Sequence, residues 1–248
     1  DGQPLKGGDI TRAMFRFKKV WRMFVEAGNP PPECSSRTSV HIHIDVRDLE
    51  VSQLKKLFLL YAVFEETFFK WSDLSRYDSN YCRSLEHNQD ITNRLSTILK
   101  ISDDMPDLLH AHLSTGNKYD AMNYLSIKQR GSVEFRLMRG TYDTGLILQW
   151  INLLLCLKLA AKDKSIIIHS FPDDMSRRGL NTLIDQVFGK WGTFLKEYAS
   201  ELDILRGVRK AQDILLANEI DNLNTQFESH SPKECSHLEA FKKAIKGA

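Results

Sequence analysis

The feature that most constrains the fold is residues 39–46, where polar and apolar side chains alternate strictly. Such alternation is typical of a β-strand, because successive side chains point to opposite faces. Four aliphatic side chains would face one way, and His41, His43 and Asp45 would face the other. Like-facing neighbours lie roughly 6.5–7 Å apart along a strand, which suits two ligands of a metal or phosphate site. A half-buried strand that shows polar side chains to water is the alternative.

Composition narrows the class of protein. The chain has 248 residues, 42% of them hydrophobic and 27% charged, enough for one large domain or for a domain with a helical appendage. A net charge of +2 provides no overall field for nucleic acid or an anionic membrane. The longest apolar run, residues 153–159, is too short to span a bilayer and contains Lys158. We therefore expect neither nucleic acid nor a membrane as a partner.

The spacing of the four cysteines indicates in which cellular compartment the protein is expected. All four are widely spaced and none forms a Cys-x-x-Cys pair. Free thiols in a reducing compartment fit this pattern better than a zinc site or a disulfide framework. We therefore expect a cytoplasmic protein.

Periodicity predicts helices over much of the chain. Apolar residues at helical spacing indicate an amphipathic core helix over about 9–27, with Asp9 as its N-cap, and a second helix over about 51–71, capped by Asp48. The glutamate pair at 65–66 is interpreted as a solvated edge of this second helix. Further helices are expected near 88–100, 104–113 and 144–162, and from 172 to 248 with breaks near 189–191, Gly207 and 231–232.

Two more segments read as strands. One strand is predicted over residues 118–127. A hairpin-type turn is predicted at 129–131, and a second strand, with alternating polar and apolar residues, over 132–139. In that last strand Glu134 and Arg136 face away from its aliphatic and aromatic residues. Taken alone, such a Glu-Phe-Arg run is ordinarily a salt-bridge element.

The polar faces of two strands suggest one site. If residues 39–46 and 132–139 lie in one antiparallel sheet, His41, His43, Asp45, Glu134 and Arg136 project into a shared cavity. Imidazole and carboxylate groups can ligate Mg²⁺ or Mn²⁺, and guanidinium groups neutralise phosphate or carboxylate. This mixture suits phosphoryl transfer from ATP, which depends on positioning and charge neutralisation. No P-loop and no Gly-x-Gly-x-x-Gly is present, so a nucleotide would lie on a sheet surface.

Four motifs in order, together with two further segments, resemble the amidoligase family, which belongs to the carboxylate–amine ligase superfamily with glutamine synthetase and glutamate–cysteine ligase. Residues 37–44, RTSVHIHI, are similar to its His-x-His strand, and residues 118–125, KYDAMNYL, to its Tyr-x-Ala-x-Asn strand. Residues 132–136 and 139–143 resemble the Glu-Phe-Arg strand and the Gly-Thr turn that follows, and residues 3–7 the segment before the first helix. The loop 76–82 is similar to that of phage-encoded members. The resemblance covers about residues 1–160.

The resemblance implies a role for each matching position. His41 and Glu134 would ligate Mg²⁺ or Mn²⁺. His43 would approach ATP or its γ-phosphate, and Arg136 and Arg139 would hold an acyl-phosphate or a substrate carboxylate. Weaker contacts to phosphate or substrate would come from Lys118, Asn123 and Arg76. The reaction would join a small-molecule or peptide carboxylate to an amine, in the host cytoplasm if the protein is phage-encoded.

The resemblance also predicts the fold. It implies an α+β fold with a curved, mainly antiparallel sheet of glutamine-synthetase type, flanked by helices. We divide the chain into a catalytic core, residues 1–170, and a helical C-terminal region, residues 171–248. The family carries further metal-ligating glutamates on strands that would precede residue 1, and we expect these to be missing. The site would then need them from another chain or a longer product, or ligase activity has been lost.

Two alternatives stay open beside the ligase. The first is a non-catalytic scaffold of the same fold, whose C-terminal helices bind a protein partner or a second copy. The second is a metal-dependent hydrolase built on His41 and His43, with Asp45 as a third ligand or base. Dependence on ATP separates the ligase from the hydrolase, and a metal between His41 and Glu134 separates the ligase from the scaffold.

Overall fold

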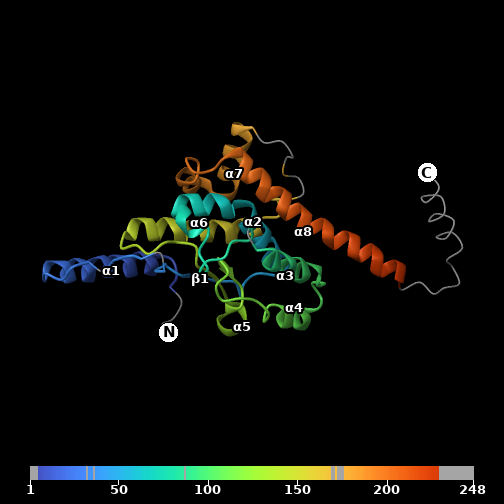
Figure 1. The fold of residues 1–248 in the computed structure, drawn as a ribbon, viewed down its shortest axis with the longest axis horizontal. Coiled ribbons are helices and arrows are strands. Elements are labelled where there is room, and N and C mark those ends of the chain that lie inside the picture. Colours follow the sequence, from blue (N-terminus) through green and yellow to red (C-terminus); the bar gives the residue numbers. More distant parts are fainter. Residues whose placement is uncertain are drawn as a thin grey trace, which may run out of the picture.

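The computed structural model describes residues 5–31, 33–35, 37–86, 88–168, 171 and 176–228, without the side chains of 106 and 216–228. Figure 1 shows a helical body around a small sheet, with α1 extending from one side of it. The α-helices are α1 Gly8–Glu26, α2 Val51–Ser72, α3 Gln89–Lys100, α4 Pro106–His112, α5 Ser126–Arg130, α6 Thr144–Lys162, α7 Arg177–Phe188 and α8 Glu201–Glu228. The 3₁₀ helices are η1 Leu74–Arg76 and η3 Gly189–Phe194, and the strands are β1 Ile42–Asp45, β2 Met122–Asn123 and β3 Ser132–Phe135.

The sheet is antiparallel and small, with the strand order β1-β3-β2. The expected α+β class is confirmed, but the sheet does not curl, and a glutamine-synthetase-type fold stays a prediction. The strand predicted over 118–127 contains only Met122 and Asn123. The Asn123 side chain accepts a hydrogen bond from the Leu125 backbone N–H at 3.0 Å, which turns the chain out of the strand.

The predicted hairpin-type turn at 129–131 is wrong, because the chain forms helix α5 there. Gly131 ends α5 in the left-handed conformation, with φ 65°, as glycine commonly does after a helix. Beyond it β3 begins at Ser132. The connection from β2 to β3 is therefore a short helix with a glycine cap.

The core is organised around α2, which is apolar on nearly every side. Its buried residues include Phe58, Phe64 and Phe68, all fully excluded from solvent. Tyr61 packs against Phe135 of β3 with ring centroids 5.5 Å apart, and α6 and α8 also pack on α2. A helix that is hydrophobic all round must be covered on several sides, so α2 is the central element of the molecule.

The C-terminal helices belong to this same core. Leu180 and Ile184 of α7 and Ile204 and Val208 of α8 are buried in the same cluster as the residues of α2 and α6. The division into residues 1–170 and 171–248 stays a prediction, and residues 172–175 and 229–248 lie outside the described residues, as do His169, His230 and His237.

The predicted break at Gly207 is wrong, because α8 continues through it. A Cβ at this position would lie 2.8 Å from both the Cα and the carbonyl carbon of Val63, and closer still to the Val63 oxygen. Gly207 therefore lets α8 approach the backbone of α2.

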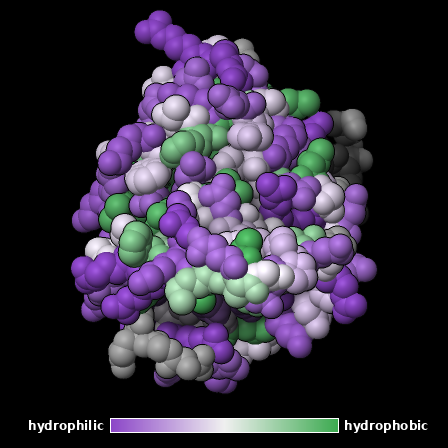
Figure 2. Space-filling view, turned by 90° about the vertical axis from the view of Figure 1, so that its left-hand side faces the viewer, coloured by the Kyte–Doolittle hydropathy of each residue, from purple (hydrophilic) through white to green (hydrophobic). Residues whose placement is uncertain are grey.

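Helix α1 is not the amphipathic core helix that its pattern predicts. It contains no buried residue; Phe15 is 70% and Val20 65% exposed. Its N-cap is Gly7, so Asp9 lies inside the first turn. Figure 2, which faces the side from which α1 extends, shows hydrophobic side chains scattered among hydrophilic ones. An apolar stripe identifies an amphipathic helix, but not the surface that it packs on.

Two acidic residues have other surroundings than expected. Asp48 is not the cap of α2, because Glu50 and Gln53 form a capping box there. Asp48 instead accepts from Lys158 at 2.5 Å and Lys162 at 2.6 Å, which ties the start of α2 to α6. The first residue of the glutamate pair 65–66 is buried at 4% exposure, so the predicted solvated edge is wrong for it.

Helix α6 has the predicted bounds and a distinct composition. Among the described residues it alone is long and apolar enough to cross a membrane by length and composition. Trp150, Leu153 and Leu157 are nevertheless fully buried in the core. Packing within the fold thus explains these three side chains, whereas Leu159 on the same helix is 64% exposed.

Candidate functional site

The register of the sheet brings the predicted residues together. His43 of β1 and Asn123 of β2 both lie directly opposite Glu134 of β3. Since alternate residues share a face, His41 and Arg136 lie on the same side as this row. The two histidines thus meet three residues that follow them by 80 to 95 positions in the chain. We call this set the Glu134 cluster: His41, His43, Asn123, Glu134 and Arg136.

Glu134 is the centre of the cluster. Its Oε1 lies 2.9 Å from His41 Nδ1 and 2.8 Å from Arg136 Nη1, with His43 Nε2 at 3.8 Å. Its other oxygen accepts from Asn123 Nδ2 at 2.7 Å. Burial alone would raise the pKa of Glu134, but the hydrogen bonds from His41 and Asn123 and the charge of Arg136 outweigh it and hold the pKa at about 2. The carboxylate stays ionised throughout the neutral range.

The two histidines differ in their second contacts. His41 Nε2 lies 2.6 Å from Ser39 Oγ, so this ring is held between Ser39 and Glu134. His43 Nδ1 lies 3.2 Å from Ser132 Oγ, and its Nε2 lies 3.4 Å from Arg130 Nη1. Burial lowers the pKa of His43, with Arg130 and Arg136 adding to the effect and Glu134 opposing it. A neutral His43 imidazole near pH 7 follows from this.

Three predicted residues lie at the margin of the cluster. Asp45 shares the β1 face, but Arg47 holds both of its oxygens, at 2.9 and 2.6 Å. Lys118 is exposed, with Nζ 5.0 Å from the centre of the Tyr119 ring. Arg139 is exposed opposite Ser39, and its charge acts on Asp73. The hydrolase hypothesis loses Asp45 as a free third ligand.

Arg76 is buried and bonds to backbone carbonyls where the pairing of the strands becomes irregular. Continuing the β1–β3 register would place Ser39 opposite Met138, but Ser39 pairs with Arg139, so β3 carries one extra residue there. Arg76 is 2% exposed, and its guanidinium donates to the carbonyls of Leu137 at 2.7 Å, Thr38 at 3.2 Å and Arg136 at 3.1 Å. The Thr38 carbonyl also accepts from the Gly140 backbone N–H at 3.1 Å, so Arg76 adds a second bond there and ties the segment before β1 to the segment after β3.

Sequence reasoning missed four residues that contact the cluster. The hydroxyl groups of Ser39 and Ser132 contact His41 and His43, respectively. Arg130 contacts His43, and the Tyr119 ring lies beside Arg136. Both serines continue the alternation of the polar faces, so their positions could have been found by extending that pattern. The position of Arg130 follows from helix α5, where the sequence pattern predicts a hairpin-type turn instead.

The comparison with protein families decides the relationship. The model of the family described as "Putative amidoligase enzyme" matches residues 9–158, more than half of the chain. This chain belongs to that amidoligase family. The match contains the whole Glu134 cluster, α2, nearly all of α1 and most of α6. No curated protein and no solved structure matches the chain.

The divalent metal that amidoligase resemblance implies does not fit the described donor set by itself. The Glu134 carboxylate already bonds to His41, Asn123 and Arg136, and a guanidinium 2.8 Å from Oε1 stands where a cation would bind. Mg²⁺ prefers oxygen ligands in an octahedron. No group of three or more His, Cys, Asp or Glu residues in the described part of the chain could hold a metal. We therefore assign no step to a bound metal ion.

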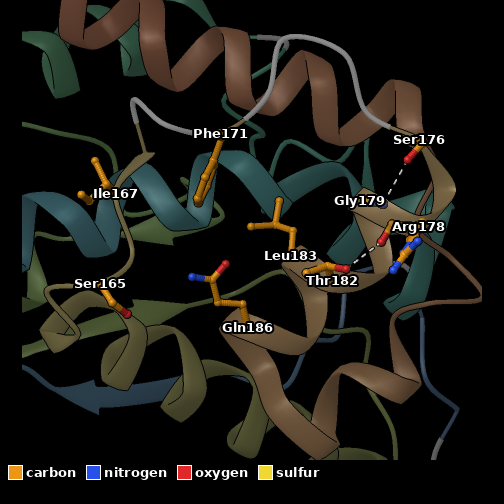
Figure 3. A pocket seen from close by; sticks show the side chains of 9 residues that line it. All are labelled: Ser165, Ile167, Phe171, Ser176, Arg178, Gly179, Thr182, Leu183 and Gln186. Atoms are coloured by element: carbon orange, nitrogen blue, oxygen red, sulfur yellow. Dashed lines mark hydrogen bonds between the residues drawn. The ribbon is translucent and has the colours of Figure 1, made fainter.

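Among the cavities of the described residues, two of the larger ones are candidate sites. A groove of about 860 Å³ runs along β1 between α1 and α6, and His41, His43 and Asp45 line it with apolar residues such as Ile10 and Ile151. A second cavity, of about 450 Å³, lies by the start of α7 (Figure 3). Its lining includes a single charged side chain, Arg178, so the groove beside the histidines is the better candidate for chemistry.

Proposed function

We propose that this chain is an ATP-dependent carbon–nitrogen ligase that joins a carboxylate to an amine through an acyl-phosphate. Its amidoligase family membership supports ligation. The observation that carries the proposal is the Glu134 cluster, in which His41, His43 and Arg136 all approach one carboxylate oxygen on a partly open sheet face. Such a mixture of cations and neutral imidazole suits reactions on anionic groups.

The proposed reaction has two steps. A substrate carboxylate oxygen would attack the γ-phosphorus of ATP, an O–P bond would form, and ADP would leave with the electron pair of the broken P–O bond. The amine then attacks the acyl carbon, the bond from that carbon to the phosphate-bearing oxygen breaks, and inorganic phosphate leaves. One proton must pass from the amine to a base.

The described residues can divide this work. Arg136, fixed by Glu134, would hold an oxygen of the substrate carboxylate or acyl-phosphate, and Arg139 would add positive charge from the adjoining edge. His43 would contact the γ-phosphate, and as a neutral imidazole it can accept the amine proton. Glu134, with its low pKa, is a poor base and would position His41 and Arg136. Asn123 would hold Glu134.

The test uses a general amine and the full chain. ADP release and hydroxamate formation are followed with Mg²⁺–ATP, hydroxylamine and a panel of carboxylic and amino acids. An ¹⁸O label in the acid should appear in the released phosphate, because the acyl-phosphate transfers one carboxylate oxygen. We expect Arg136→Met to lower turnover at least about a hundredfold, the size of a lost transition-state contact, while the surface control Lys164→Met keeps the rate.

The result that would overturn the ligase is equally direct. Absence of ADP release, and absence of saturable Mg²⁺–ATP binding in calorimetry, would leave the non-catalytic scaffold as the better account. The occupied Glu134 carboxylate already gives that alternative some support. ATP-independent hydrolysis would instead favour the hydrolase.

A further inference from the structure

Beside the Glu134 cluster the structure contains a row of cations and tyrosines that the proposed reaction does not use in full. The row consists of Arg37, Tyr81, Tyr119, Lys118 and Arg136, and we call it the cation–tyrosine row. Arg37 lies 5.2 Å from the centre of the Tyr81 ring, and Tyr81 meets Tyr119 edge-on with centroids 5.7 Å apart. Lys118 Nζ and the Arg136 guanidinium lie 5.0 and 5.8 Å from the Tyr119 ring centre.

The charges of the row are not balanced within the described part of the chain. Arg136 pairs with Glu134, but no described carboxylate forms an ion pair with Arg37 or Lys118, and both are exposed. The neighbouring Asp120 is already held by Arg83 and Arg94. Two cations held on aromatic rings therefore remain available to an external anion.

The row is also held in place. The Tyr119 backbone N–H donates to Asn117 Oδ1 at 3.0 Å, and its carbonyl accepts from the Arg83 backbone N–H at 2.8 Å. These hydrogen bonds fix the backbone that carries the Tyr119 ring, which Lys118 and Arg136 contact. A binding surface whose support is fixed in advance loses less entropy when a ligand arrives.

We propose that the cation–tyrosine row binds a second carboxylate of the acid substrate, so that the preferred acids are dicarboxylates. This inference rests on the proposed function, since Arg136 would hold the reacting carboxylate at one end of the row. Lys118 and Arg37 bind the second carboxylate, and the faces and edges of Tyr81 and Tyr119 contact the carbon chain between the two. A polyphosphate carries similar charge but has no apolar section to match the rings.

The test measures binding without ATP, so that it does not depend on turnover. Ligand-observed NMR titrations compare dicarboxylates of four to six carbons with monocarboxylates of equal length, such as glutarate with valerate. We expect saturable binding of at least one dicarboxylate and weaker binding of its monocarboxylate. Lys118→Met and Arg37→Met should each weaken that dicarboxylate about fivefold, the size of one partly exposed ion pair, and Lys164→Met should leave it unchanged.

Two further sets of titrations complete the test. The first asks whether the Tyr119 ring contributes to binding apart from the cations, and the second asks whether the row prefers a dicarboxylate to phosphate or ATP. Tyr119→Phe should keep the affinity because the ring face remains, whereas Tyr119→Leu should lower it. Inorganic phosphate and Mg²⁺–ATP are titrated into the same variants. The proposal is overturned if no dicarboxylate binds better than its monocarboxylate, or if the variants weaken phosphate or ATP but not the dicarboxylate. The ADP-release assay on Arg136→Met tests the ligase separately.

Discussion

At the scale of single residues, burial changes the chemistry of two glutamates in opposite directions. Glu134 is surrounded by donors and has a pKa of about 2, whereas Glu65 sits in the core and burial raises its pKa to about 8. In Glu65 the hydrogen bond from the Leu85 backbone N–H, at 2.7 Å, and the charge of Lys210 only partly offset the burial. The same side chain is therefore an anion at the site and largely neutral in the core at pH 7.

Glu65→Gln should flatten the dependence of stability on pH. The folded pKa of Glu65 is raised from 4.5 to about 8, so the folded state holds the proton more tightly. The stability from this group is complete below pH 4.5 and is lost as pH rises through about 8. Urea unfolding at pH 6 and pH 9 should show a smaller decrease for the variant than for the wild type. Equal decreases would show that Glu65 does not titrate in this range.

Glu134→Gln should show the opposite dependence. Its folded pKa is lowered from 4.5 to about 2, so its contribution is present above pH 4.5 and disappears as pH falls through about 2. We expect the variant to lose about 1.5–3 kcal/mol of unfolding free energy at pH 7, the usual value of a hydrogen bond to a charged group. The difference from wild type should shrink in urea unfolding at pH 3. A constant difference would exclude the ionised carboxylate as its cause.

At the scale of elements, the path of α8 across α2 depends on one glycine. Helix propensity disfavours a glycine at position 207, yet α8 is continuous there. Only a residue without a Cβ lets the backbone of α8 lie this close to that of Val63. The propensity signal and the packing requirement conflict, and packing decides.

Gly207→Ala should destabilise the protein although alanine is the better helix former. The gain in propensity is about 1 kcal/mol, whereas a Cβ 2.8 Å from two Val63 backbone atoms forces the helices apart. We expect a net loss of about 1–3 kcal/mol in urea unfolding. The matched control is Gly8→Ala in α1, where a Cβ would meet only the flexible end of Arg12 at 3.5 Å. Similar effects at both positions would contradict the close approach.

At the scale of the whole molecule, one core joins the family-matched segment to the residues after it. The match ends at residue 158, yet α7 packs on α6 and α8 packs on α2 and α3. Phe188 meets Phe64 of α2 edge-on with centroids 4.8 Å apart. The sheet that carries the Glu134 cluster rests on α2, so the site depends on these helices for its support.

A fragment of residues 1–170 should therefore fail to fold on its own. Without α7 and α8, the fully buried Phe64 and Phe68 of α2 would lose part of their cover. We expect no cooperative thermal transition by circular dichroism, whereas the full chain measured beside it should show one. A cooperative transition in the fragment would favour a domain boundary near residue 170.

Alternation and helical period were enough to locate α2, α6, β1 and β3 and the residues that share the polar sheet face, because these patterns are local. The His-x-His and Glu-Phe-Arg motifs also identified the family. The tertiary structure alone decided that α1 stays exposed, that α8 continues through Gly207, that Arg76 binds backbone carbonyls and that Glu65 is buried. Each depends on contacts between residues far apart in the chain, and local sequence patterns carry no information on which partner covers a given face.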